Sequence, residues 1–357
     1  MKSEQFINLQ SIYGIGLAVL VLLSSGCGKF DRSKIKLPEF NVATSENLHS
    51  IAAVDAQNIW VSGNYGTVLS SADKGRTWQE HESGIEELLL GSITFVNQNE
   101  GWAAGVKGTI VHTSDAGKNW TVQPSNIEYD IHDLYFLDAR HGWAVGEFGT
   151  AFHTDNGGKK WRSLIEPTDI FYNDVFFVDR MTGWIVGEFG TILHTRDGGI
   201  TWQNQECPDL AALVAGGDWD RPQPALYGIY FIDKNRGWIV GLDGVIIQTV
   251  DGGNTWKKVD SGTDKSLYSV VIKGQKGWIV GNKGAYLMSD DGGNTWDLRE
   301  NAIKTKFWLR EISFIDDLHG LIVGARGTIV LTEDGGENWE IVSGFGYDME
   351  EFGLADF

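Results

Sequence analysis

The sequence is poor in cysteine and in positive charge. Its 357 residues include only 2 Cys, too few to build a disulfide-rich small domain. Lys and Arg together number 29 against 48 Asp and Glu, so the formal net charge is -19. Negative charge on this scale opposes binding to the phosphate backbone of nucleic acids and to anionic membrane surfaces. The composition therefore argues against a nucleic-acid partner.

Long apolar runs are also scarce. The N-terminal run, residues 12–23, is shorter than the ~20 residues that a transmembrane helix needs. It ends in small residues followed by Cys27, an order that resembles a bacterial lipoprotein signal. We expect residues 1–27 to be a signal peptide with lipidation at Cys27, and a cleaved secretory signal is the alternative. The protein would then be exported and held at the periplasmic or lumenal face of a membrane, or at the cell surface, by its lipid, with residues 28–45 as a polar tether.

Glycine and tryptophan are abundant, with 46 and 15 copies, and they recur in repeats. The first repeated motif is the Asp-box, Ser/Thr-x-Asp-x-Gly-x-x-Trp. Seven copies end at Trp78, Trp120, Trp161, Trp202, Trp256, Trp296 and Trp339, and the third copy has Asn156 in place of Asp. A second motif, Gly-Trp-x-Val-Gly-x-x-Gly-Thr, precedes each box with some variation, as in GWIVGEFGT from Gly183. Two coupled motifs in seven copies indicate a repeat architecture.

Each repeat divides into four short segments with strand character. In the third repeat they are residues 131–137, 142–146, 150–153 and 161–164, separated by Gly, Asp and Asn turn signals. About 42 residues with four antiparallel strands is the size of one propeller blade. The sequence therefore predicts an all-β, seven-bladed propeller over residues 46–343, followed by an acidic and aromatic C-terminal tail, residues 344–357.

The Asp-box residues have a structural explanation. The Asp carboxylate can accept hydrogen bonds from its own turn, Gly allows positive φ, and Trp packs beneath the turn. We therefore predict that these carboxylates stabilise hairpins, and we assign no catalytic residue, metal or cofactor.

The two coupled motifs resemble those of the photosystem II assembly and stability factor family of cyanobacteria and chloroplasts. The resemblance covers roughly residues 46–343, and Cys27 matches the lipoprotein character of bacterial members. It implies a non-enzymatic, seven-bladed assembly factor that binds a newly made membrane-protein subunit on the lumenal or periplasmic side. Photosynthetic members carry an arginine cluster on one face, whereas the motifs place no such cluster here.

The innermost strands of the predicted blades contain two adjacent polar columns that vary between repeats. A packed position should repeat, whereas a ligand-facing position is free to differ. We name the first the mouth column: His49, Gly91, His132, Asn173, Tyr227, Tyr268 and Arg310. We name the second the belt column: Ser50, Ser92, Asp133, Asp174, Gly228, Ser269 and Glu311. The hypothesis is that one of them rims the central channel and contacts a partner, and the alternative is a water-filled pore.

Charged loops are expected on the face that carries the connections between blades. Acidic residues occupy the early connections, at Glu82, Glu86, Glu87, Glu128, Glu166 and Asp169. Basic residues enter the later ones, at Lys265, Lys304 and Lys306. The sequence predicts a face that is acidic over blades 1–4 and mixed over blades 5–7, suited to a basic or bipolar protein segment. Ordinary solvating charges are the alternative.

An insertion of about a dozen residues interrupts the spacing of the repeats near residues 204–225. It contains Trp219 and Arg221, residue types that are frequent at interaction hot spots. A long loop on a rigid scaffold is a common place for function, so we predict a partner contact there. The alternative is a loop that caps the channel and buries Trp219.

Two other chemistries can be weighed from the sequence. His112, His153 and His194 share one column of adjacent sheets, which is too widely spaced for a common zinc ion. A glycan-binding or glycan-cleaving propeller is the alternative function. A glycosidase would need a carboxylate pair with a raised pKa in a pocket flanked by aromatic rings.

Overall fold

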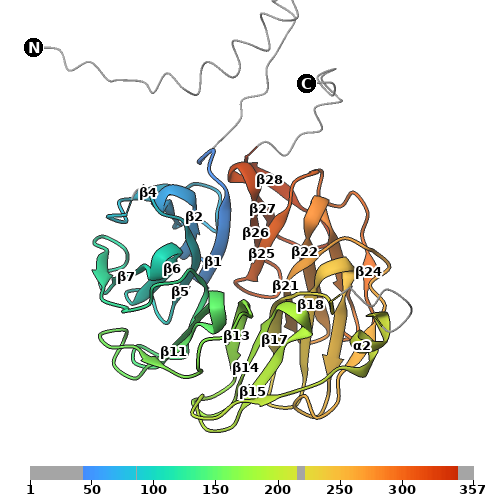
Figure 1. Ribbon diagram of the computed structural model, residues 1–357. Helices are drawn as coiled ribbons and strands as arrows, with labels where there is room; N and C mark the ends of the chain where they lie inside the picture. The colour runs from blue at the N-terminus through green and yellow to red at the C-terminus, as the bar shows by residue number, and fades with distance from the viewer. Residues whose placement is uncertain (1–42, 86, 215–221, 345–357) are drawn as a thin grey trace, which may run out of the picture. The chain divides into compact units, whose positions relative to one another are not determined.

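The computed structural model describes residues 43–344 except residue 86 and residues 215–221. These residues form seven four-stranded antiparallel sheets arranged around a central channel (Figure 1). The prediction of an all-β, seven-bladed propeller is therefore confirmed. The proposed signal peptide, Cys27, Trp219 and Arg221 lie outside the described residues.

Every blade is built from four strands that are consecutive in the chain, with the first strand innermost. Blade 1 consists of β1 (Leu48–Asp55), β2 (Asn58–Gly63), β3 (Val68–Ser71) and β4 (Gln79–His81), and blade 2 of β5 (Leu90–Phe95), β6 (Gly101–Gly105), β7 (Ile110–Thr113) and β8 (Thr121–Gln123). Blade 3 consists of β9 (Ile131–Phe136), β10 (Gly142–Gly146), β11 (Ala151–Thr154) and β12 (Arg162–Ser163), and blade 4 of β13 (Tyr172–Phe177), β14 (Gly183–Gly187), β15 (Ile192–Thr195) and β16 (Gln203–Asn204).

Blades 5–7 repeat the same order. Blade 5 consists of β17 (Leu226–Phe231), β18 (Gly237–Gly241), β19 (Ile246–Thr249) and β20 (Lys257–Val259), and blade 6 of β21 (Leu267–Lys273), β22 (Lys276–Gly281), β23 (Tyr286–Ser289) and β24 (Asp297–Leu298). Blade 7 consists of β25 (Leu309–Phe314), β26 (Gly320–Gly324), β27 (Ile329–Thr332) and β28 (Glu340–Ser343). Among the described strands, none from one end of the chain joins the sheet at the other end. Blade 7 packs directly against blade 1 and closes the ring.

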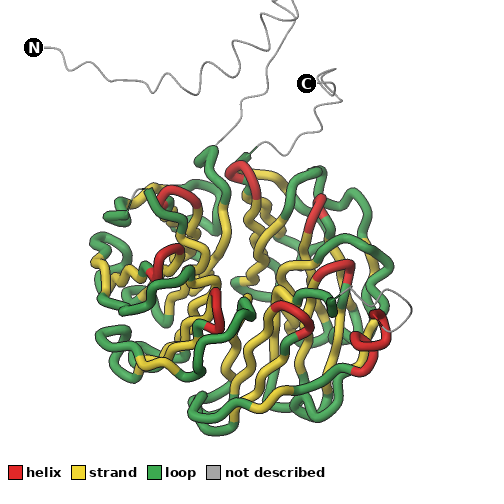
Figure 2. The backbone as a smooth tube through the Cα atoms, in the orientation of Figure 1, coloured by secondary structure: helices red, strands yellow, loops and turns green. Residues whose placement is uncertain are grey.

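A three-residue 3-10 turn joins the second and third strands of each blade. The seven turns are η2 (Asn64–Gly66), η3 (Val106–Gly108), η4 (Glu147–Gly149), η5 (Glu188–Gly190), η6 (Leu242–Gly244), η7 (Asn282–Gly284) and η8 (Ala325–Gly327). Figure 2 shows them in red around the channel. They share one side of the propeller with the connections between blades, as the bond from Gly149 N to Ile170 O illustrates. We call this side the turn face, and the opposite side, with the Asp-boxes, the box face.

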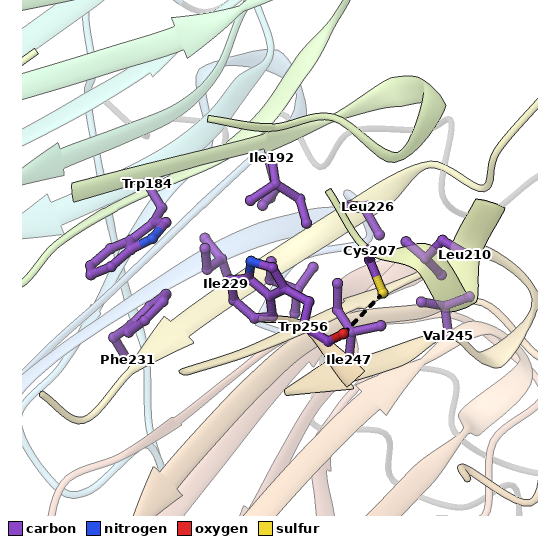
Figure 3. Close-up of a cluster of buried hydrophobic side chains, with 12 residues drawn as sticks. Trp184, Ile192, Cys207, Leu210, Leu226, Ile229, Phe231, Val245, Ile247 and Trp256 are labelled. Atoms are coloured by element: carbon purple, nitrogen blue, oxygen red, sulfur yellow. Dashed lines mark hydrogen bonds between the residues drawn. The ribbon is translucent and has the colours of Figure 1, made fainter. Parts of the chain in front are cut away.

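The core lies between neighbouring blades. In five of the seven seams the motif Trp of one blade stacks on a ring from the first strand of the next, with Trp184 and Phe231 centroids 3.6 Å apart. Figure 3 shows this cluster, which also contains Cys207 and Leu210. Burial of large aromatic surfaces, worth about 1.5–3 kcal/mol for each side chain, binds the blades into one ring.

The Asp-box prediction is confirmed in detail. Asp251 accepts bonds from Thr249 Oγ1 at 2.9 Å, Thr255 N at 2.8 Å and Thr255 Oγ1 at 2.7 Å. In blade 3, Asn156 Oδ1 still accepts bonds from Thr154 Oγ1 and Lys160 N, both at 3.0 Å.

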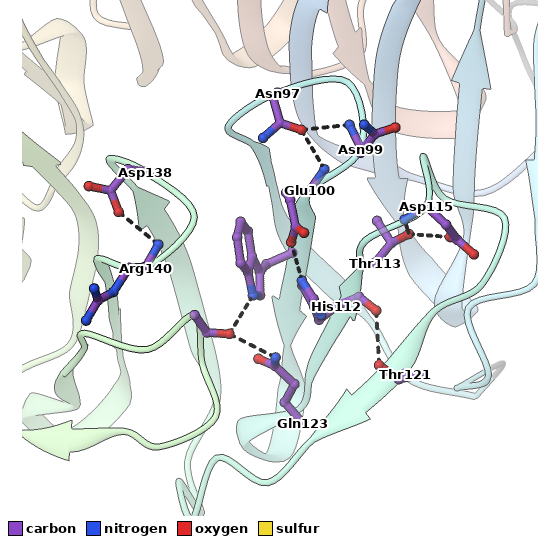
Figure 4. Close-up of polar contacts among 12 residues, drawn as sticks. Asn97, Asn99, Glu100, His112, Thr113, Asp115, Thr121, Gln123, Asp138 and Arg140 are labelled. Carbon is purple, nitrogen blue, oxygen red and sulfur yellow. Dashed lines mark hydrogen bonds and ion pairs between the residues drawn. The ribbon is translucent and has the colours of Figure 1, made fainter.

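A second set of acidic turn residues was missed by the sequence reasoning. Asp138 lies in the hairpin between the first two strands of blade 3 and accepts bonds from Arg140 N and His141 N at 2.8 and 2.9 Å (Figure 4). These bonds, with those from His141 and Arg180, hold the pKa of Asp138 well below its ordinary value even though its partial desolvation acts in the opposite direction. Five further residues at this turn bond in the same way: Asp55, Asn97, Asp179, Asp233 and Asp316. Much of the excess negative charge therefore stabilises turns on the box face.

Candidate functional site

A β-bulge in every innermost strand brings the two polar columns together at the channel. In blade 4 the pairing register with β14 shifts between Tyr172 and Asp174, which leaves Asn173 in the bulge. The same shift occurs at the mouth-column residue of all seven blades. A bulge redirects a side chain that would otherwise point to the opposite side of the strand. We had expected one of the columns to rim the channel, and the structure places residues of both there.

The belt column links each blade to the next. Asp174 Oδ2 accepts a bond from Ile229 N at 2.8 Å, and Glu311 Oε2 accepts one from Ile51 N at 2.9 Å across the closure of the ring. Six of the seven positions make this bond; the remaining four accept from Ile93, Leu134, Val175 and Ile312. Gly228 has no side chain to do so, and a Cβ there would lie 2.5 Å from Tyr268 O. The variable belt column therefore has a shared architectural role.

Three belt residues place carboxyl groups in the channel. Burial raises the pKa of Glu311 to about 7 despite the bonds that it accepts. Burial, followed by the neighbouring carboxyl of Asp133, raises the pKa of Asp174. Each carboxyl also accepts a hydrogen bond from a backbone N–H of the next blade. These groups therefore connect neighbouring blades in addition to lining the channel.

The mouth column surrounds the turn-face opening of the channel. Its side chains contact neighbouring blades: His132 Nδ1 lies 3.0 Å from Tyr172 O, and Asn173 Nδ2 donates to Leu226 O at 2.8 Å. The Arg310 guanidinium lies 5.3 Å from the centre of the Tyr268 ring, a cation–π contact. Together with the belt residues they enclose a small cavity of about 70 Å³. An opening of this size suits one inserted side chain rather than a whole small molecule.

Larger hollows open toward the box face. One of about 310 Å³ occupies the channel below the belt, where Tyr135, Phe176 and Tyr230 line one side. Another of about 380 Å³ lies among the first hairpins of blades 3–5. The raised pKa of Asp174 beside these aromatic rings meets two of the requirements for a glycosidase.

The turn face surrounds the mouth with residues in a strained backbone conformation. The middle residue of every 3-10 turn has φ between 51° and 56° without being glycine: Tyr65, Lys107, Phe148, Phe189, Asp243, Lys283 and Arg326. The left-handed region is unfavourable for bulky side chains, and such strain concentrates at functional sites. Tyr65 is 64% exposed and Phe189 is 52% exposed. This conformation holds aromatic rings in solvent around the mouth.

Aromatic contacts continue from the rim to the mouth over blades 3 and 4. The ring centroids of Tyr129 and Phe148 lie 4.8 Å apart, those of Phe148 and Phe171 5.1 Å, and those of Phe171 and His132 6.1 Å. This chain forms a half-exposed apolar strip beside acidic loops. An exposed apolar strip rimmed by charge is typical of a protein contact surface.

The arginines of the described residues do not cluster on the turn face. Among the described residues, Arg310 and Arg326 lie there, whereas Arg180 and Arg236 pair with Asp138 and Asp233 of box-face hairpins. Apart from residue 86, the acidic connection residues precede β5, β9 and β13, and Lys265 and Lys304 precede β21 and β25. The described turn face has the charge polarity that the sequence predicts.

The insertion begins at the outer edge of blade 5. Helix α2 (Pro208–Val214) packs against the blade through buried Leu210, and Asp209 Oδ2 accepts a bond from Lys258 N at 2.9 Å. Buried Cys207 lies 3.7 Å from Trp256 O. The chain returns on the turn face, where Gly190 N donates to Pro224 O. The described part of the insertion therefore covers the side of blade 5 and not the channel.

The histidines of the third strands stack on tryptophans of their own blades. His194 lies 4.7 Å from the Trp184 ring and His153 lies 5.1 Å from the Trp143 ring, while His112 Nε2 lies 2.8 Å from Glu100 Oε2. Packing accounts for their positions. Within residues 43–344 as described, no cluster of His, Cys, Asp and Glu suits a metal, and no helix could cross a bilayer.

The fold and the site define a single-domain Asp-box propeller with a polar channel mouth and an aromatic, charged face. The model of the family described as photosynthesis system II assembly factor YCF48 matches residues 31–126, 122–206 and 221–301. These segments cover more than half of the chain, which therefore belongs to that family.

Individual relatives share limited sequence with this chain. The photosystem II assembly lipoprotein Ycf48 of Synechocystis sp. is 46% identical over 41 residues, which span 11% of this chain and 12% of the relative. Because the match spans only this small part of the relative, it does not by itself assign the relative's activity to this chain.

Solved structures share the fold. YCF48 from Cyanidioschyzon merolae superposes with a TM-score of 0.66 at 21% identity, over 84% of this chain and 98% of that one. The structure of YCF48 bound to D1 peptide superposes with a TM-score of 0.67 at 20% identity, over 84% of this chain and 95% of that one. A GH74 xyloglucanase from Xanthomonas campestris gives 0.67 at 10% identity, over 85% of this chain and 55% of that one.

Proposed function

We propose that this protein is a non-enzymatic scaffold that binds a segment of a membrane protein through its turn face and assists the assembly of that protein into a complex. The observation that carries the proposal is the ring of aromatic and charged residues held in left-handed turns around the channel mouth. Family membership and the peptide complex of a structural relative support the same class of partner.

The partner would be an extended or looped segment with charge of both signs. Its basic part would lie over the acidic connections of blades 1–4, and its acidic part over Arg310 and Arg326. The mouth-column residues His49, His132, Asn173, Tyr227, Tyr268 and Arg310 would contact it, with one side chain entering the small cavity. Trp219 and Arg221 would add contacts, because the insertion returns on this face at Pro224.

A lipid on Cys27 would anchor the scaffold to the membrane that holds its client. The described chain begins at Ala43, whose N–H donates to Ser343 Oγ at 2.9 Å, and enters β1 from the turn face. The 15 residues between Cys27 and Ala43 reach at most about 50 Å when extended. The first described residues thus lie on the side of the propeller where we place the client.

A D1 peptide is the available probe for this surface. We expect the full chain to bind it, and the double variant Phe148→Ser/Phe189→Ser to bind at least about tenfold more weakly, because both exposed rings lie on the turn face. Ile200→Ser is the matched control, since Ile200 is 65% exposed in an Asp-box. Fluorescence anisotropy measures the dissociation constants, and thermal melting checks that each variant is folded. Equal weakening by the turn-face and control variants would refute the assignment.

A glycosidase is the second candidate, favoured by the raised pKa of Asp174 beside Asp133 and the aromatic side of the channel. A glycosidase of the usual kind needs two carboxyl groups free to act on a glycosidic bond. Here both groups are tied to the next blade, through Val175 N and Ile229 N. We therefore expect no hydrolysis of xyloglucan by the full chain; hydrolysis that Asp174→Asn abolishes would instead establish the enzyme.

A further inference from the structure

The turn face of blades 6 and 7 carries a group of basic residues, which we call the basic sector: Lys265, Lys283, Lys304, Lys306, Arg310 and Arg326. Lys283, Lys304 and Arg326 are exposed, and Arg310 is half-buried in the mouth. Aromatic rings lie among them: Arg326 stands 4.7 Å from the centre of the Phe307 ring, and Trp308 stacks on His49 at 5.5 Å. In a chain of net charge -19, this concentration of positive charge is a local exception.

The described chain ends beside this sector. Strand β28 runs toward the turn face, where Ser343 pairs with Ile329 at the start of β27 (Figure 1). Gly344 then lies against turn η8, because a Cβ placed on it would be 2.6 Å from Thr328 Cα and 2.8 Å from the carbonyl carbon of Gly327. Its φ of +91° is another reason for glycine at this position. Gly344, the last described residue, therefore lies beside the turn that carries Arg326.

The composition of residues 345–357 is complementary to the basic sector. The segment contains Asp348, Glu350, Glu351 and Asp356 and no Lys or Arg. It also contains four aromatic residues: Phe345, Tyr347, Phe352 and Phe357. Thirteen residues reach up to about 40 Å from Gly344, which is ample for neighbouring blades and the channel mouth.

We propose that residues 345–357 dock on the basic sector of the same molecule. The acidic groups would lie over Arg326, Lys283 and Arg310, and an aromatic ring would pack beside Trp308 or Tyr268. Attachment at Gly344 raises the effective concentration of the segment at this surface, so weak individual contacts suffice.

Docking of the segment would make it an internal competitor for the acidic end of any client. The inference goes beyond the proposed function, because the docking itself requires no client. A client would have to displace the segment, so its apparent affinity falls in proportion to the fraction of molecules in which the basic sector is free.

Photocrosslinking within the full chain tests the docking. A benzophenone amino acid at Phe352 is expected to crosslink to residues of blades 6 and 7, identified by mass spectrometry of the monomer band. The charge reversal Asp348→Lys/Glu350→Lys/Glu351→Lys should lower this yield at least about fivefold, since several surface ion pairs are lost together. The charge-preserving variant Asp348→Glu/Glu350→Asp/Glu351→Asp should keep it.

Three results would overturn the proposal. The crosslinks could fall on the box face or on residues 28–42, they could join isotopically distinct copies of the chain, or their yield could ignore charge reversal. Binding of the D1 peptide by the same variants separates the two claims. If charge reversal abolishes docking but leaves peptide affinity unchanged, the segment does not compete with a client, and only that claim is rejected. If the parent chain docks its segment normally but binds no peptide, only the proposed function is rejected.

Discussion

At the scale of single residues, the acidic side chains of this protein do two different things. Most of those in turns are acceptors for nearby N–H and O–H groups, as Asp251 and Asp138 show. Those of the belt column join blades and bring carboxyl groups into the channel, where burial raises the pKa of Glu311 and Asp174. Residue type alone does not distinguish the two roles, because only the surrounding backbone decides which bonds a carboxylate accepts.

Asp251 provides a test of the turn role. Asp251→Ala removes three acceptor bonds and should lower the free energy of unfolding by about 1–2 kcal/mol. Asp251→Asn should cost less than about 1 kcal/mol, because Asn156 makes two of the corresponding bonds in blade 3. Urea unfolding measures both values. Similar losses for the two variants would contradict the hydrogen-bond account.

Glu311 provides a test of the channel role. Burial raises its pKa from 4.5 to about 7, so the folded state retains a proton that the unfolded chain releases between these values. Its contribution to stability is therefore present below about pH 4 and is lost as the pH rises toward 7. Glu311→Gln keeps an acceptor for Ile51 N and should remove this loss.

The variant is thus expected to be roughly 1–3 kcal/mol more stable than the parent near pH 8 and equally stable near pH 4; the range extends to the lower value because the Glu311 side chain is only half-buried. Thermal unfolding at the two pH values measures the difference. A constant difference between variant and parent at all pH values would contradict a raised pKa at Glu311.

At the scale of elements, the sequence predicted the strands well and their irregularities poorly. In blade 3 the four predicted segments correspond to β9–β12 with ends shifted by at most one residue. The bulge at His132 was not predicted, because a one-residue register shift leaves no mark in a polar–apolar pattern of six residues. That missed bulge is why two adjacent columns, rather than one, reach the channel.

The aspartates of the inner hairpins were missed for another reason. Their signal is one polar position four residues before the second repeated motif, as Asp138 lies before Gly142 and Asp316 before Gly320, and that motif was defined only from its Gly onward. The sequence of the belt column shows that Gly228 has no side chain to accept a bond from the next blade. It does not show that a larger residue would collide there with Tyr268 O. Such distances are set by packing between blades.

At the scale of the whole molecule, the seam between blades 7 and 1 differs from the other six. Leu321 replaces the motif Trp and packs with Ala53, whereas every other seam keeps its Trp. In five of those seams the Trp stacks on a ring, as Trp102 does on Phe136 at 3.7 Å, and between blades 5 and 6 Trp238 packs with Ile272. No described strand is exchanged across the seam, whose contacts include the Ile51–Glu311 bond, the Arg76–Glu333 ion pair and the stack of His49 on Trp308. Because the motif Trp is missing from its core, we expect this seam to open first.

Hydrogen exchange followed by mass spectrometry tests this ranking. Under native conditions, amides of β1 and β25 should exchange at least about fivefold faster than those of β13 and β17, because local opening follows the smallest buried contact. Leu321→Trp/Ala53→Gly, which restores a large ring, should narrow the difference. Uniform protection of all seven innermost strands would contradict the account of ring closure.

The whole molecule also presents two unlike faces, and the account depends on the turn face being the one that meets the client. Phe189 of the turn face and Ile200 of the box face are both exposed and lie in the same blade. The most direct measurement is photocrosslinking in intact membranes from a benzophenone placed at either position in the full chain. The account predicts one predominant membrane-protein adduct from position 189 and none from position 200. The same adduct from both positions, or from position 200 alone, would contradict it.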